Sequence, residues 1–182
     1  MFEKYYKDVV CEDLILKENI TNIHLIPNIS AITMNYSSGL LVKNPQFTVP
    51  ALTGFQLMYG QKPKVTKAKK SVSGFQVREN QLLGCKLTLR RQRLFFFLEK
   101  LVFTILPRLN VIEEKTLHKS HYNLGIIQTL LFPEVENYYD SFEFLKGCQL
   151  SMLLTAKSYQ SSRLLLSSFK IITGQMNPQI SQ

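Results

Sequence analysis

The chain has 182 residues, 45% hydrophobic and 19% charged, so it can bury the core of one ordinary domain and is not a disordered polymer. Its formal net charge of +9 indicates an anionic partner. No apolar run is long enough to span a bilayer, and the N-terminus has the composition of neither a signal peptide nor a transit peptide. Three cysteines without short spacing argue against a disulfide framework or a zinc finger and fit a reducing compartment.

The first two predicted elements are a helix and a strand. Residues 3–18 place apolar side chains at helical spacing, and Asn19 is the expected C-terminal stop. Residues 29–36 alternate, which predicts a half-buried strand. One face of this strand should carry Ile32, Met34 and Tyr36, and the other Ala31, Thr33 and Asn35.

A second helix is predicted to begin after Asn44, which is followed by a proline suited to the first helical position. It should run to Tyr59, with Gly60 as its C-terminal cap. Because proline and glycine both disfavour a helix interior, Pro50 and Gly54 predict that this helix is short or broken.

Three short strands are predicted next, at residues 64–66, 75–78 and 83–90, the last two pairing with each other across a tight turn. Residues 67–74 lack any periodicity, so they are expected to form an exposed loop. The third strand alternates cleanly, with Cys85, Leu87 and Leu89 on one face and Lys86, Thr88 and Arg90 on the other.

Residues 91–106 are apolar on nearly all sides, which predicts a well-buried helix that ends at Pro107. The polar segment 110–121 is interpreted as a loop. Further strands are expected at 122–132 and 148–155.

A short helical stretch ending at Gly147 should join these two strands, and Ser158 is a good N-cap for a last helix through Phe169. Residues 1–172 thus form a single domain, followed by a loose tail at 173–182 with little apolar content. Strands and helices interleave without regular alternation, which favours an α+β fold.

No catalytic site is predicted. His118 and His121 lie three residues apart, just after Glu113 and Glu114, but a metal site needs three or four converging ligands, so solvated loop residues are the simpler interpretation. Phosphate-binding loops, dinucleotide fingerprints and nucleophile elbows are absent from the sequence. We therefore expect no enzyme activity, no cofactor and no metal.

Positive charge is concentrated in one quarter of the chain. Residues 61–108 hold twelve of the 22 Lys and Arg residues and only two acidic ones. Within them, residues 62–70 include five lysines, which repel one another unless an anion neutralises them. A plain solvated charge run is the alternative for this segment taken alone.

The adjoining strand favours the interpretation that this segment binds an anion. Lys86, Thr88 and Arg90 share a sheet face at a spacing of about 6–7 Å, close to the rise along a nucleic-acid backbone. Phe75 and Tyr36 are candidate stacking surfaces beside them. Folded RNA is the predicted ligand.

The same region carries a family resemblance. Two segments, 60–75 (GQKPKVTKAKKSVSGF) and 83–90 (LGCKLTLR), closely resemble the ribosomal protein L5 family, large-subunit proteins that bind 5S rRNA. Matches follow in family order from residue 5 to about residue 169. They include residues 5–8, 32–35, 106–108, 122–125, 132–134 and 155–157.

The resemblance implies an antiparallel β-sheet with helices packed on one face, in a structural protein of the central protuberance. Implied partners are 5S rRNA, large-subunit rRNA, P-site tRNA, neighbouring central-protuberance proteins and a protein of the small-subunit head; no membrane is implied. Asn35, Gln61, Thr66, Thr88 and Arg90 match the family's RNA-facing positions, and residues 67–83 resemble its projection toward the T-loop of the tRNA. With the local cationic and polar residues, the expected RNA-binding set adds Lys62, Lys64, Lys67, Lys69, Lys70, Ser71, Phe75, Arg78 and Lys86.

The chain also departs from the family pattern. Between Pro107 and Tyr122 it is about four residues shorter and carries Glu113 and Glu114, in the region implied to contact the small-subunit head. Arg91 stands where the family commonly has glycine.

The amino-acid composition suggests where the gene resides. Residue types with AT-rich codons (Phe, Tyr, Ile, Asn and Lys) total 59, against 25 for those with GC-rich codons (Ala, Gly, Arg and Pro), and the match begins four residues after Met1. We expect an organelle-encoded protein of the mitochondrial matrix; an AT-rich bacterium or a plastid is the alternative. In function, the alternative is a free RNA chaperone or assembly factor that uses the same sheet.

Overall fold

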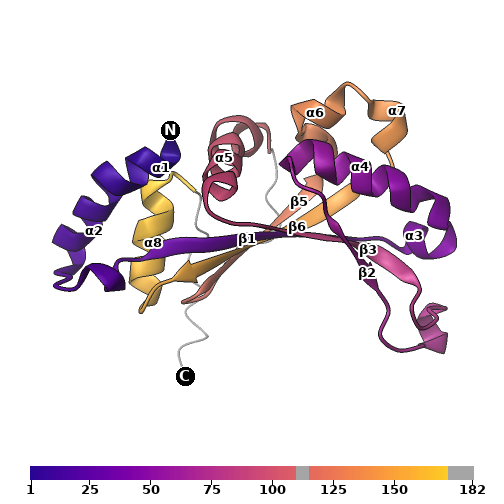
Figure 1. Ribbon diagram of the computed structural model, residues 1–182, viewed down its shortest axis with the longest axis horizontal. Coiled ribbons are helices and arrows are strands. Elements are labelled where there is room, and N and C mark those ends of the chain that lie inside the picture. The colour runs from indigo at the N-terminus through magenta and orange to yellow at the C-terminus, as the bar shows by residue number, and fades with distance from the viewer. Residues whose placement is uncertain (110–114, 172–182) are drawn as a thin grey trace.

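A six-stranded antiparallel sheet organises the protein, with strand order β2-β3-β1-β6-β5-β4. The computed structural model describes residues 1–109 and 115–171 (Figure 1). The strands are β1 (Asn28–Ser37), β2 (Lys64–Lys67), β3 (Leu82–Leu89), β4 (Lys115–Leu117), β5 (His121–Gln128) and β6 (Lys146–Thr155). This arrangement confirms the predicted α+β class.

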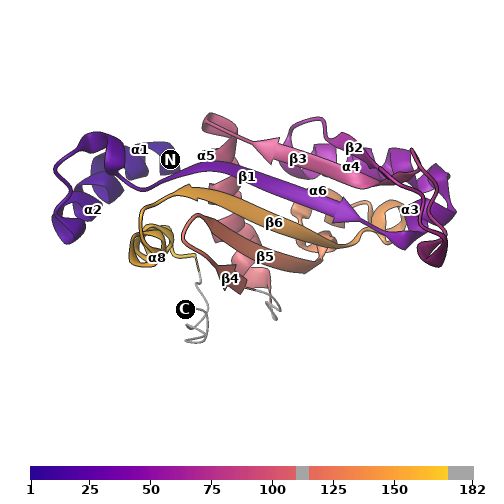
Figure 2. The same cartoon turned by 90° about the horizontal axis from the view of Figure 1, so that it is seen from below.

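Helices cover one face of the sheet and leave most of the other open, as Figures 1 and 2 show from two directions. The helices are α1 (Phe2–Tyr5), α2 (Cys11–Glu18), α3 (Gly39–Lys43), α4 (Thr48–Tyr59), α5 (Gln92–Lys100), α6 (Pro133–Glu136), α7 (Tyr139–Phe142) and α8 (Tyr159–Ser168). The π-helical segments Tyr6–Val10 and Leu101–Ile105 continue α1 and α5. Within the described ranges, no helix is long and apolar enough to cross a membrane.

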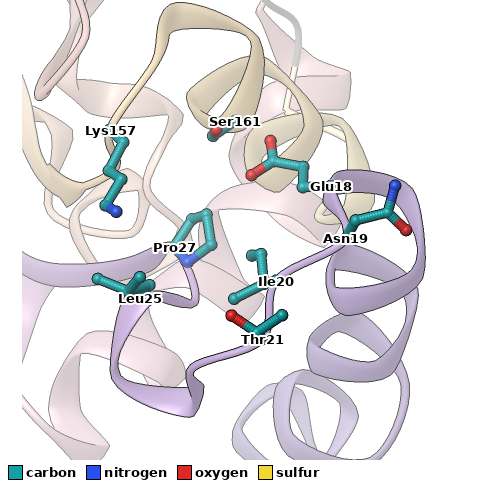
Figure 3. A pocket seen from close by; sticks show the side chains of 8 residues that line it. All are labelled: Glu18, Asn19, Ile20, Thr21, Leu25, Pro27, Lys157 and Ser161. Atoms are coloured by element: carbon teal, nitrogen blue, oxygen red, sulfur yellow. The ribbon is translucent and has the colours of Figure 1, made fainter.

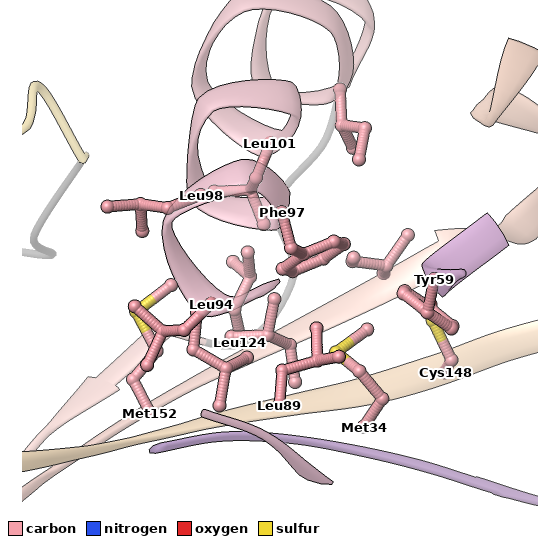
Figure 4. Packing of buried hydrophobic residues seen from close by; sticks show 14 of the residues in the cluster. Met34, Tyr59, Leu89, Leu94, Phe97, Leu98, Leu101, Leu124, Cys148 and Met152 are labelled. Atoms are coloured by element: carbon pink, nitrogen blue, oxygen red, sulfur yellow. The ribbon is translucent and has the colours of Figure 1, made fainter. Parts of the chain in front are cut away.

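The core lies between the sheet and this helical layer. The predicted faces of the first and third strands are confirmed, because Ile32, Met34 and Tyr36 of β1 and Cys85, Leu87 and Leu89 of β3 are all at most 2% exposed. Figure 4 shows side chains of α5 reaching down onto these strands and onto Leu124 of β5 and Met152 of β6. Burial of a side chain of this size contributes about 1.5–3 kcal/mol, so this layer holds the sheet in place.

The predicted end of the N-terminal helix and the predicted N-cap of the C-terminal helix are both confirmed. Asn19 ends α2 in the left-handed conformation, with a φ of 49°. The Ser158 side chain accepts a hydrogen bond from the backbone N–H of Ser161 and so caps α8. Phe169, at the end of α8, packs its ring against Phe2 and Tyr6 and thereby joins the two ends of the domain.

The prediction that α4 is short or broken was wrong. Pro50 is the third residue of the helix, in the first turn, where a backbone N–H has no partner inside the helix to lose. At Gly54 an added Cβ would lie 2.8 Å from the Leu145 side chain, so this glycine allows α4 to pack closely. Gly60 caps the helix as predicted, with a φ of 66°.

The strand predicted at 75–78 does not exist. Ser73–Phe75 is a 3-10 turn and Gln76 has a φ of 55°, which bends the chain away from an extended path. β3 pairs with β2 instead. The interpretation of 110–121 as a loop was wrong for β4 and for the start of β5. Residues 129–131, predicted as strand, form a 3-10 turn.

Two further expectations need correction, and others lie outside the described residues. Phe96 and Phe103 of the 91–106 helix are 69% and 60% exposed, so this helix is buried on one face only. The helical stretch before β6 ends at Phe142, and Gly147 lies within the strand. Glu113, Glu114 and the predicted tail at 173–182 are not described.

Candidate nucleic-acid interface

The open face of the sheet carries rows of side chains that run across the strands. The first row joins Lys64 of β2, Lys86 of β3, Asn35 of β1 and Gln149 of β6, each directly opposite the next. Both lysines are exposed, and they face each other across neighbouring strands. Like charges in such a pair destabilise a sheet, so the free protein gains nothing from this arrangement. An anion between them would reverse the sign of the interaction.

A second row is polar but uncharged. Thr88, Thr33, Ser151, Asn123 and Thr116 lie opposite one another from β3 to β4. The Thr33 and Thr88 hydroxyls are 3.5 Å apart, the Ser151 hydroxyl donates to Asn123, and the Asn123 amide donates to Thr116. The open face therefore has a basic half on β2 and β3 and a neutral half on β6, β5 and β4.

The sequence predicted only some of the residues that form these two rows and the rest of the open face. Asn35, Lys64, Thr66, Lys86 and Thr88 lie on the open face as predicted. The residues it missed are Thr33, Thr116, Asn123, Gln149 and Ser151. Their signal was the alternation within β5 and β6, but the rows depend on strand register, which a single sequence does not specify.

Gln61 occupies the corner between the sheet and the helices. Its side-chain amide donates to the Thr88 carbonyl at 3.2 Å, and its oxygen accepts from the Arg93 guanidinium at 3.3 Å. These contacts fix Gln61 beside the second row. Lys62 and Arg90 are exposed at the same rim of the sheet.

The segment between β2 and β3 projects beyond the sheet, away from the helical layer (Figure 1). It is ordered by paired backbone hydrogen bonds between Val72 and Val77 and by the Ala68 N–H, which donates to the Gln81 carbonyl at 2.9 Å. Phe75, at its tip, is 80% exposed. This projection also carries Lys69, Lys70, Ser71 and Arg78, all exposed, and Lys67 lies at its base.

Lys100 and Arg108 differ from the other cations of residues 61–108, because they form ion pairs among the described residues. Lys100 is half-buried, 2.6 Å from the Glu134 carboxylate, and Arg108 is 3.0 Å from Glu136. Burial lowers the pKa of Lys100 and its contact with Glu134 opposes that shift, which marks a structural ion pair. The cations of the rows, rim and projection form no ion pair within residues 1–109 and 115–171. These are the cations free to meet an anionic ligand.

Tyr36 does not offer the predicted stacking surface. Its ring is 1% exposed on the helix-covered face, and its hydroxyl donates to the Phe144 carbonyl at 3.2 Å. The expectation failed because Tyr36 follows the alternation of β1 into the core. Phe75 remains available for stacking.

Neither the cysteines nor the histidines assemble a reactive centre in the described part of the chain. Burial raises the pKa of the Cys85 and Cys148 thiols to about 12, so neither is a nucleophile at neutral pH. His118 and His121 are exposed at the turn between β4 and β5, and no cluster of three metal-ligating side chains occurs among the described residues.

A cavity of about 220 Å³ lies at the other end of the domain, between the end of α2 and the start of α8 (Figure 3). Its charged lining consists of one anion, Glu18, and one cation, Lys157, so it lacks the net positive charge of the open face. An uncovered sheet face with unpaired cations and a cationic projection is instead typical of a protein that binds folded nucleic acid.

Comparisons with known proteins define the family. The family model described as Ribosomal protein L5 matches residues 22–78, and the model for the C-terminus of the same ribosomal family matches residues 82–172. The large ribosomal subunit protein uL5 of Neisseria meningitidis is 34% identical over 171 residues, covering 92% of this chain and 94% of that protein. The uL5 protein of Aromatoleum aromaticum is 37% identical over 172 residues, covering 92% and 95%. The uL5c protein of Gracilaria tenuistipitata is 36% identical over 168 residues, covering 90% of this chain and 93% of that protein.

The chain therefore belongs to the ribosomal protein L5 family, and it is a structural, non-catalytic constituent of the large ribosomal subunit.

Proposed function

We propose that the basic half of the open face binds 5S rRNA in the central protuberance of the large subunit. The observation that carries this proposal is the row formed by Lys64, Lys86 and Asn35. Its two lysines form no ion pair among the described residues, and they face each other on a surface that none of the described helices covers. A phosphate placed between the lysines neutralises their repulsion, and the Asn35 amide supplies a hydrogen-bonding group beside it. Large-subunit rRNA and neighbouring proteins would complete the contacts.

The family assignment argues against the free RNA chaperone or assembly factor that the sequence alone left as an alternative. Sedimentation separates the two, because a resident protein stays with mature large subunits through a high-salt wash and a factor is released. We expect the protein to remain with the large subunit and to be recovered with 5S rRNA when the subunit is stripped. Loss of the protein in the wash, or its recovery without 5S rRNA, would reject the proposal.

The projection between β2 and β3 is proposed to contact P-site tRNA. It is cationic and extends beyond the sheet, and its exposed Phe75 can stack on an unpaired base. Removal of residues 69–74 should leave incorporation into subunits intact and weaken P-site tRNA occupancy about two- to fivefold, since rRNA and the codon also hold the tRNA.

Reconstituted subunits that carry the trimmed protein provide the measurement, with full-length protein as the reference. If the trimmed protein fails to incorporate while tRNA binding per assembled subunit is unchanged, the projection anchors rRNA and does not contact tRNA. Contact with the small-subunit head stays a prediction, because Glu113 and Glu114 lie outside the described residues.

The proposed location is a mitochondrial ribosome, because the chain is rich in residue types whose codons are AT-rich. The relatives compared above are bacterial and plastid proteins. Detection of the reading frame in purified mitochondrial DNA tests it; a plastid or bacterial origin would replace it.

A further inference from the structure

Arg91 lies where the chain leaves β3 and enters α5, and it has a φ of 54° and a ψ of −135°. Glycine adopts this conformation freely, whereas in other residues the Cβ crowds the neighbouring backbone. Asn19 and Gln76 also have positive φ, but they occupy the left-handed helical region, which is less costly. Arginine at this corner therefore destabilises the folded state relative to glycine.

Nothing in the described chain offsets that cost. The Arg91 side chain is exposed, and its guanidinium makes no hydrogen bond or ion pair within residues 1–109 and 115–171. Arg93, two residues later, differs because its guanidinium holds Gln61. Strained residues persist where they serve a function, so the benefit of Arg91 is expected outside the chain.

The surroundings of Arg91 favour an anion. Arg90 is exposed beside it and continues the alternation of Lys86 and Thr88 at the end of β3. Residues 61–108 contain two acidic residues, Glu79 and Glu99. Glu79 lies in the projection between β2 and β3, and Glu99 is 3.5 Å from the N-terminal amine, so neither forms an ion pair with Arg91. Arg90 and Arg91 are consecutive cations without an ion pair among the described residues, and each guanidinium can hold a phosphate through two parallel hydrogen bonds.

We propose that Arg91, together with Arg90, binds a backbone phosphate of the RNA held on the open face. This inference rests on the proposed function and extends it, because it carries the interface from the basic half of the sheet around the rim toward α5. It assigns to Arg91 a gain in RNA affinity at the expense of stability in the free protein.

The variant Arg91→Gly tests both halves of the proposal, since it removes the guanidinium and relieves the backbone. Relief should raise Tm by about 3–8 °C. Loss of one phosphate contact should flatten the log–log salt dependence of binding to a 5S rRNA transcript by about 0.7–0.9 and weaken binding about fivefold at 0.1 M salt.

Lys170→Gly is the matched control, because Lys170 is exposed after α8, has a φ of 58°, and also loses one positive charge on substitution. We expect it to raise Tm without changing the salt dependence. A salt dependence that Arg91→Gly leaves unchanged, or that Lys170→Gly flattens equally, would overturn the phosphate site while wild-type binding upholds the proposed function. A fall in Tm for Arg91→Gly would show that the backbone conformation of Arg91 does not destabilise the folded protein. Failure of the wild-type protein to bind the transcript would reject the proposed function and this inference with it.

Discussion

The two faces of β3 have opposite relations to stability. Leu87 on the helix-covered face is 2% exposed and packs in the core, so the folded state depends on it. Lys86, one residue earlier, points to the open face and directly opposes Lys64, which disfavours the folded state slightly. Burial in the core thus accounts for one face of the strand, whereas the opposed lysines of the other face are accounted for by the anionic ligand that we propose.

Replacement of the buried leucine should have the largest effect on folding. Leu87→Ala leaves a cavity and should lower the free energy of unfolding by about 2–5 kcal/mol, as measured by urea denaturation. Leu153→Ala is the matched control, because Leu153 lies on the open face of β6 and is 41% exposed. We expect it to cost less than about 1 kcal/mol. If Leu153→Ala costs more than Leu87→Ala, the two faces are assigned the wrong way round.

Removal of charge from the open end of β3 should have the opposite profile. The double variant Lys86→Ala, Arg90→Ala should leave the free energy of unfolding nearly unchanged, because both side chains are exposed and unpaired among the described residues. If each contacts one phosphate, the slope of log affinity against log salt should flatten by about 1–2 units. Titration of 5S rRNA at several salt concentrations measures that slope.

The control pair for this charge removal is Lys4→Ala, Arg163→Ala, which deletes the same two charge types from the exposed sides of α1 and α8. Its slope should change little. Equal flattening by both pairs would mean that overall charge, not the β3 face, governs binding.

These contrasts also show how far the sequence alone reaches. Alternation within a strand follows from its own residues, so the faces of β1 and β3 and the exposure of Lys86 could be predicted. The partner of each strand could not be predicted: β3 pairs with β2, whereas the expected partner at 75–78 is interrupted by the positive φ of Gln76, a residue type that does not favour that conformation. The prediction that Pro50 breaks the helix failed for a related reason. The effect of a proline depends on its position within the helix, and that position is set by where α4 begins.

Candidate site residues show the same division. Lysines crowded along the chain are apparent from the order of residues, so the basic half of the open face was predicted, whereas the neutral half was not. Ser151 and Asn123 join the second row only through strand register, which places Ser151 opposite Thr33 and Asn123 opposite Ser151. Tyr36 was misplaced because its aromatic character suggested stacking, although the alternation of β1 already placed it in the core.

The smallest expected effect separates the basic half of the open face from the neutral half. Thr88→Val keeps the shape and strand propensity of the side chain and removes one hydroxyl, so folding should be nearly unaffected. Loss of one hydrogen bond to RNA should weaken binding by about 0.5–1.5 kcal/mol, or roughly two- to tenfold. Thr116→Val removes the same group at the far end of the row, on β4. It should leave affinity unchanged, because the opposed lysines that we propose to bind phosphate lie on β2 and β3, at the other edge of the sheet. Equal losses from both variants would extend the RNA interface over the whole open face, and a loss from Thr116→Val alone would move it to the neutral half.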